Sequence, residues 1–174
     1  MEALQRMSFS LLTSLSFSQE GPDLLSAEAA RCSAKEGHLD ILKFLRAQNP
    51  PCPWNGENCS QAAAAGGHLE VLKWMRDQDP PCPWNERTCA SAAEGGHLEV
   101  LKWLRGQDPP CPWDKWTCSY AARGGHLEIL KWLRAQNPPC PWSKSDSRKE
   151  ASWFGHQHII KWIDQQEDES DAED

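Results

Sequence analysis

The sequence has no surplus of basic residues and no long apolar run. It carries 18 lysines and arginines against 25 aspartates and glutamates in 174 residues, for a formal net charge of −7. Seven of these acids lie within residues 164–174, so the rest of the chain is electrically balanced. A nucleic-acid-binding face needs a basic surplus, and a membrane-spanning helix needs about 20 apolar residues. We therefore expect neither a nucleic-acid nor a membrane partner.

The two ends differ in composition from the rest of the chain. Residues 1–22 mix apolar residues with serines, and the segment carries Glu2 as well as Arg6. A secretory or organelle-targeting peptide would have a basic start and an uninterrupted apolar stretch. We predict a flexible N-terminal extension, with a targeting peptide as the alternative, and a disordered acidic tail over 164–174. An intracellular, cytoplasmic monomer is expected.

Signatures of catalysis are also missing. The sequence has no nucleophile elbow, no phosphate-binding glycine loop and no His-Glu zinc helix. Catalysis needs one asymmetric group of nucleophile, base and orienting residue, whereas this chain offers near-copies of one unit. We predict a protein that is not an enzyme, with no catalytic residues, no metal ligands and no cofactor.

What the chain does have is an internal repeat. Gly-His pairs recur with histidine spacings of 30, 29, 29 and 30 residues; they are Gly37-His38, Gly67-His68, Gly96-His97, Gly125-His126 and Gly155-His156. A fixed period in this range is typical of a solenoid, in which each unit packs on its neighbours. We predict one repeat domain over 23–163, with units at about 23–51, 52–81, 82–110, 111–139 and 140–163.

Each unit has the pattern of two short helices. A residue that caps helix N-termini follows the tryptophan of each loop: Asn55, Asn85, Asp114 and Ser143. The first helix should run about 10 residues to the glycines. The second, 97–107 in the third unit, should stop at Asp108, because a residue that precedes proline leaves the helical region. Small residue pairs in the first helix allow close packing, and a Glu-Lys-Arg stripe on the second should face solvent.

The repeated units resemble those of a known protein family. The segments AAEGGHLEVLKWLR (92–105) and AARGGHLEILKWLR (121–134) resemble ankyrin repeats, and the Cys-Pro-Trp variant is similar to repeats of giant viruses and some algae. The resemblance covers roughly residues 24–163 and implies an all-α solenoid of about five ankyrin-like helix-turn-helix repeats. Ankyrin repeats have about 33 residues. Because Pro-Pro-Cys-Pro occupies the place of their β-hairpin, we expect stunted loops between repeats.

The end units depart from this pattern. In the last one Asp164 stands where other units have arginine, and Gln157 and His158 replace Leu127 and Glu128. The first unit lacks a preceding Cys-Pro-Trp segment. We interpret both as caps, whose outer faces meet water.

The eight cysteines raise the question of metal or redox chemistry. Three pairs have C-x6-C spacing: Cys52/Cys59, Cys82/Cys89 and Cys111/Cys118. Zinc sites usually need four ligands at closer spacings. After Cys140, a serine, Ser147, stands at the position where the C-x6-C spacing would place the second cysteine. We favour small buried apolar residues, with the loop tryptophan packed over the joint between repeats. The alternative is a zinc- or thiol-based redox sensor. The repeated histidines are expected to bond backbone groups.

Specificity on a repeated scaffold should lie where the units differ. The candidate partner-binding residues, on the first helix and loop, are Glu57, Glu86, Arg87, Lys115, Trp116, Tyr120 and Arg123. Trp116 and Tyr120 share a helix face and have no aromatic counterparts in neighbouring units; tryptophan, tyrosine and arginine dominate interface hot spots. We predict a scaffold that binds an unidentified protein. In the alternatives, Trp116 merely covers an apolar joint, or the chain is a degenerate copy without a partner.

Overall fold

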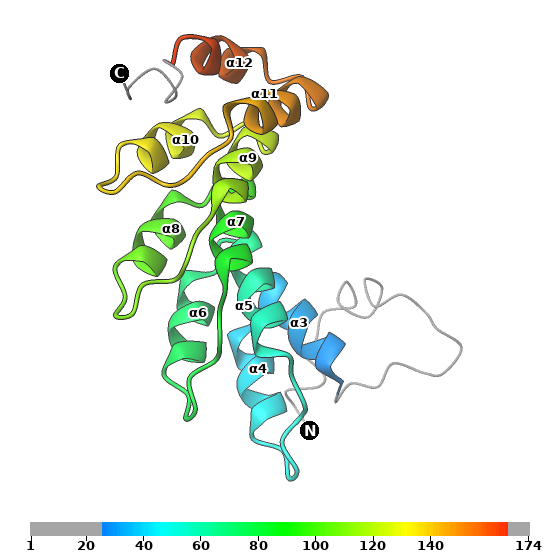
Figure 1. Ribbon diagram of the computed structural model, residues 1–174. Coiled ribbons are helices and arrows are strands. Elements are labelled where there is room, and N and C mark those ends of the chain that lie inside the picture. Colours follow the sequence, from blue (N-terminus) through cyan, green and yellow to red (C-terminus); the bar gives the residue numbers. More distant parts are fainter. Residues whose placement is uncertain (1–25, 167–174) are drawn as a thin grey trace.

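The computed structural model describes residues 26–166 of the chain (Figure 1). This range contains helices and connecting loops and no strand, so the all-α prediction is confirmed. The predicted extension 1–22 and most of the predicted tail 164–174 lie outside the described residues.

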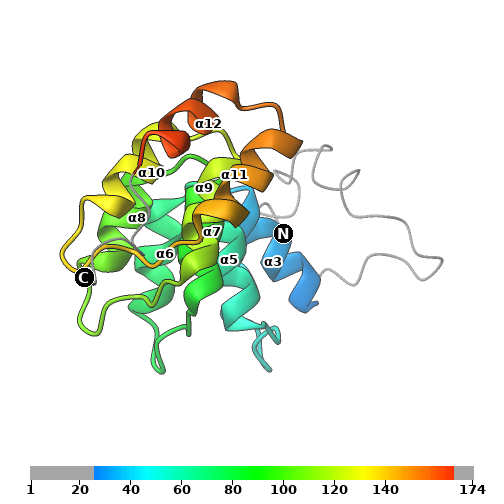
Figure 2. The ribbon, with the colours of Figure 1, turned by 45° about the horizontal axis from the view of Figure 1, so that its top comes forward.

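The helices form two layers along a curved array (Figures 1 and 2). The first helices of the units are α3 (Ala27–Lys35), α5 (Gly56–Ala65), α7 (Glu86–Glu94), α9 (Lys115–Arg123) and α11 (Lys144–Trp153). The second helices are α4 (Leu39–Arg46), α6 (Leu69–Arg76), α8 (Leu98–Arg105), α10 (Leu127–Arg134) and α12 (Gln157–Asp164). Each first helix packs on the next one along, and each second helix packs on its own first helix.

The predicted N-caps start the first helices. Asn85 accepts a hydrogen bond from the Arg87 N–H at 3.1 Å, and the Asn85 N–H donates to Thr88 Oγ1 at 3.3 Å. Asp114 and Thr117 make the same reciprocal pair in the next unit. The threonine of each Thr-Cys dipeptide is therefore half of a capping box, which satisfies two backbone donors at the helix start.

The prediction for the second helix is wrong at its end. In the third unit the helix covers Leu98–Arg105 and stops well before Asp108. The Gly106 N–H bonds the carbonyls of Lys102 and Trp103, and the Gln107 side chain donates to the Trp103 carbonyl at 3.0 Å. The glutamine thus gives a last-turn carbonyl a second donor beside the Gly106 N–H. The helix therefore ends before the residue whose conformation the proline restricts.

The packing between first helices depends on small residues. Ala92 and Ala93 of α7 and Ala121 and Ala122 of α9 are fully buried. In the last unit Ala151 is buried but Ser152 is exposed. The cap interpretation agrees with this difference.

The loop tryptophans lie at the joints between units, as predicted, but the arginine of the expected solvent stripe does not face water freely. Arg105 donates to the Cys111 carbonyl at 2.6 Å, and its guanidinium lies 3.9 Å from the centre of the Trp113 ring. Trp113 in turn meets Trp132 of α10 edge-on, at 6.2 Å, so the chain of contacts runs from Arg105 in the third unit to the fourth. The same arrangement recurs as Arg46–Trp54–Trp74, Arg76–Trp84–Trp103 and Arg134–Trp142–Trp162.

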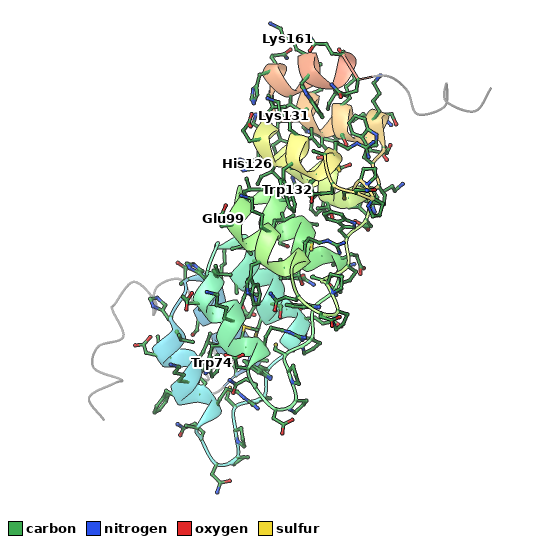
Figure 3. The ribbon with its side chains drawn as sticks, turned by 90° about the vertical axis from the view of Figure 1, so that its left-hand side faces the viewer. Trp74, Glu99, His126, Lys131, Trp132 and Lys161 are labelled. Carbon is green, nitrogen blue, oxygen red and sulfur yellow. The ribbon has the colours of Figure 1, made fainter. Side chains whose placement is uncertain are left out.

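Only the glutamate and lysine of the stripe behave as predicted. Glu99 and Lys102 form an exposed pair at 2.8 Å within α8, and Glu128 and Lys131 repeat it in α10. Figure 3 looks onto the second helices, which carry Glu99 and Lys131. The arginine differs because one turn further along the helix it reaches the loop, where a carbonyl and an aromatic ring both attract a guanidinium.

The repeated histidines join neighbouring units through backbone, as predicted. His97 Nε2 lies 3.0 Å from the carbonyl of Ala65, the last residue of α5. His68, His126 and His156 make the same contact with Lys35, Glu94 and Arg123, at 2.8, 3.0 and 2.9 Å. A carbonyl only accepts, so Nε2 carries the hydrogen in each case. The bond satisfies a helix C-terminal carbonyl across the joint.

The glycine of each Gly-His pair in the first four units makes room for the histidine of the following unit. Gly96 has φ +83°, and a Cβ built there would lie 2.6 Å from Cε1 of His126 in the next unit. Glycine is thus required twice at this position, once for the left-handed backbone and once for the close approach of the ring. We refer to the histidine of one unit, with the glycine and helix-end carbonyl of the unit before it, as the histidine junction.

Three glycine-to-alanine variants separate these two requirements. Gly96→Ala meets both a positive φ and the His126 ring, whereas Gly155→Ala has φ +78° and nothing within 4 Å. Gly106→Ala meets neither, and Ala135 already occupies the matching place. We expect losses of unfolding free energy of about 1–2 kcal/mol for Gly155→Ala, a further ~1–3 kcal/mol for Gly96→Ala and under ~0.5 kcal/mol for Gly106→Ala. Urea denaturation measures all three; equal losses at Gly96 and Gly155 would contradict the junction.

Candidate partner-binding surface

The first helices align their second and sixth residues after the N-cap into two rows. The row of second residues contains Glu57, Arg87 and Trp116, and the row of sixth residues contains Gln61, Ser91 and Tyr120. A hollow of about 650 Å³ lies on this face of α5, α7 and α9; its lining comprises Gln61, Glu86, Arg87, Ala90, Ser91, Asp114, Trp116 and Tyr120. Four of the seven predicted site residues therefore line one hollow: Glu86, Arg87, Trp116 and Tyr120.

The hollow exists because α7 carries small residues between larger neighbours. Ala90 and Ser91 form part of its lining, while Gln61 of α5 and Tyr120 of α9 flank it. The Gln61 amide donates to Asn85 Oδ1 at 3.3 Å, which holds α5 against α7 on this side. The hollow thus depends on a difference in side-chain size between neighbouring units.

Two aromatic side chains line the α9 side. The rings of Trp116 and Tyr120 lie 6.5 Å apart and are tilted by 48°. Trp116 is 45% exposed, and Lys115 Nζ lies 5.1 Å from the centre of its ring. The tryptophans at the joints are the loop and second-helix residues, such as Trp113 and Trp132, so Trp116 is not needed for that role.

The other predicted residues lie around the hollow. Glu57 accepts from the Asn85 amide at 2.9 Å, and Lys115 pairs loosely with Asp146 at 3.8 Å. Arg123 lies one turn beyond Tyr120 and pairs with Glu94 at 3.2 Å. These are exposed contacts between long side chains, which contribute little to stability and leave the groups available to a partner.

Sequence analysis missed two exposed aromatics on α11 and its C-cap. Trp153 is 85% exposed and Phe154 48% exposed, and the Arg123 guanidinium lies 5.0 Å from the centre of the Phe154 ring. Phe154 occupies the place of the first glycine in the Gly-Gly-His pattern, and this substitution was the signal available. The sequence predicts only a cap for the last unit, whereas its Phe154 ring also contacts Arg123 of α9.

Seven of the eight cysteines are buried, as the favoured interpretation predicted, and Cys32 is half-buried. The loop cysteines are more than apolar filler, because each thiol points at a carbonyl at the start of a first helix: Cys82 at Gly56, the first residue of α5 (3.3 Å), and Cys111 at Asn85, the N-cap of α7 (3.4 Å). Within residues 26–166, no group of three or more His, Cys, Asp or Glu residues could hold a metal ion.

The thiol environments do not support the sensor alternative. Cys89 contacts Cys111 of the following loop rather than acting with Cys82, its C-x6-C partner, and this contact and burial raise the pKa of Cys89. Burial raises the pKa of Cys59 to about 12. The thiolate is the nucleophile and the metal ligand, so groups held as neutral thiols are poor at both.

The family comparison agrees with the repeat architecture. A family model described as ankyrin repeats (many copies) matches residues 89–134, from within α7 to the end of α10. The matched segment is similar to ankyrin repeats, and the same helix pair and histidine junction recur on both sides of it. The predicted helical repeat solenoid is confirmed. A search of curated proteins found no match. No helix within residues 26–166 has the length and apolar character to cross a membrane.

The buried thiols predict how stability depends on pH. The pKa of Cys59 is raised in the folded chain to about 12 from an ordinary value of 9.0, so the unfolded chain loses this proton first. The free energy of unfolding should therefore fall as pH rises above about 9, by at most about 1.4 kcal/mol per pH unit for this thiol. Urea denaturation from pH 7 to 10.5 measures the slope. Cys59→Ala should flatten it, and an unchanged slope would contradict the assignment.

Proposed function

We propose that this chain is a non-catalytic scaffold that binds a partner protein through the first-helix face around the hollow. Ankyrin repeats generally serve as protein-interaction modules, and the observation that carries the proposal is the make-up of the hollow. Its lining comes largely from matching positions of α5, α7 and α9, while the side chains at these positions differ from unit to unit. Variation confined to one surface of a regular scaffold is how repeat proteins acquire specificity.

The chemistry of the hollow suits a protein segment. An apolar or aromatic side chain of the partner would enter beside Ala90 and Ser91 and lie against Trp116 and Tyr120. Glu86 and Arg87 would pair with charges on either side of it. Buried aromatic anchors with a polar rim are the usual source of binding energy in such interfaces.

The same lining does not pair its serine with a histidine or lysine that could activate it as a nucleophile. We further propose an intracellular, cytoplasmic location, because a chain rich in buried thiols suits a reducing compartment.

Affinity capture from lysate, with the captured proteins identified by mass spectrometry, tests the surface. Ser91→Tyr should fill the hollow without harming the fold, because α9 already carries Tyr120 at the matching position. We expect Ser91→Tyr and Trp116→Ala/Tyr120→Ala to weaken the captured partner's binding by at least ~10-fold.

Two matched controls accompany these variants. Ser91→Ala leaves the hollow open, and Lys102→Ala changes an exposed residue of α8 on the other layer. Both should bind the partner like the unaltered chain. If the hollow-filling variant and the double variant retain full affinity, the partner binds elsewhere.

A further inference from the structure

The histidine junction has two complementary halves, and each internal unit uses both. The donor half is the histidine before the second helix, such as His97. The acceptor half is the positive-φ glycine and the last carbonyl of the preceding first helix, Gly67 and Ala65 in that case. Four such junctions hold the five described units together.

At the C-terminal end the acceptor half is open. Gly155 keeps the left-handed backbone, with φ +78°, yet a Cβ built there would meet nothing within 4 Å. No described residue donates a hydrogen bond to the Trp153 carbonyl, which ends α11 as Ala65 ends α5. The Trp153 side chain beside it is 85% exposed.

At the N-terminal end the donor half is open. His38 has φ −79° and ψ 76°, close to the −87° and 76° of His68. Its ring nitrogens make no hydrogen bond to any residue within 26–166, whereas His68 donates to Lys35. The described array therefore carries one unused half at each end.

We propose that copies of this chain associate head to tail through a fifth histidine junction. His38 of one copy lies over Gly155 of the next, and its Nε2–H donates to the Trp153 carbonyl. The interface continues the intramolecular stacking, so it needs no new geometry. Such a heterologous contact extends into open chains rather than closing into a symmetric dimer. This outcome departs from the monomer expected from sequence.

The neighbouring positions are compatible with this contact. Glu94 and Arg123 end adjacent first helices and pair at 3.2 Å; Lys35 and Trp153 hold the same positions at the two ends. Lys35 would then face the exposed Trp153 ring, which favours a cation–π contact. Glu36 stands where internal units have glycine, but Phe154 stands there too, and its junction still forms at 2.9 Å.

The proposed contact between copies is weaker than an internal junction, because the arginine–tryptophan and tryptophan–tryptophan contacts of the loop side are absent. Asp164 replaces the arginine that contacts a loop tryptophan, and Phe44 replaces the second-helix tryptophan. Ser152, in place of alanine, makes the end surface more polar. The association is therefore reversible and depends on protein concentration.

Sedimentation velocity of the full chain over a concentration series tests the proposal. The unaltered chain should move from the 19.6 kDa monomer to larger species as concentration rises. His38→Ala removes the donor half and Gly155→Leu blocks the acceptor half, so each variant alone should stay monomeric. Mixed one to one, they still hold one intact half each and should form a heterodimer.

The mixture also shows that both variants are folded, because an unfolded chain would not complement the other. Lys102→Ala, far from both ends, is the control and should associate like the unaltered chain. A constant monomer mass for the unaltered chain would overturn the proposal. Association by both single variants, or a mixture that stays monomeric, would overturn it equally.

Discussion

The array depends on one contact, the histidine ring that lies on a glycine of the preceding unit and donates to the end of its first helix. The contact affects the short helices in three ways. It satisfies a C-terminal carbonyl, it demands a glycine where the chain reverses, and it sets the spacing between first helices. His97 shows all three at once, with Nε2 at 3.0 Å from the Ala65 carbonyl. Helices of eight to ten residues would be marginal without such neighbours.

On the loop side of each joint, a few residues make the contacts that connect one unit to the next. The arginine at the end of the second helix binds the loop cysteine carbonyl and stacks on the loop tryptophan, which reaches the next unit. The cysteine thiol turns inward to the carbonyl of a first-helix N-cap. The Cys-Pro-Trp segment is thus a compact joint that replaces a projecting hairpin, which accounts for a period shorter than that of ordinary ankyrin repeats.

Much of the fold could be predicted from period and capping residues, because these depend on local chemistry. The N-caps, the buried cysteines and the backbone-bonding histidines all follow from residue type and position. The end of the second helix could not, because a rule based on the proline does not anticipate the bonds that Gly106 and Gln107 make to the last-turn carbonyls. Nor could the role of Arg105, whose partners lie in a loop that sequence periodicity does not place.

The candidate site shows the same division. Trp116 and Tyr120 could be selected because they differ from their counterparts in other units. The hollow itself could not, since it arises where Ala90 and Ser91 lie between the side chains of two other helices. Trp153 and Phe154 were overlooked because a degraded repeat suggests a cap, and only the three-dimensional arrangement shows how exposed they are.

The most direct test of the account is the tautomeric state of the histidines, measured by nitrogen-15 NMR on the dilute chain at mildly alkaline pH. The account predicts that His68, His97, His126 and His156 carry the hydrogen on Nε2 in slow exchange with water, while His38 exchanges rapidly. Hydrogen on Nδ1, or rapid exchange at all five rings, would show that the histidine junctions do not hold the array together.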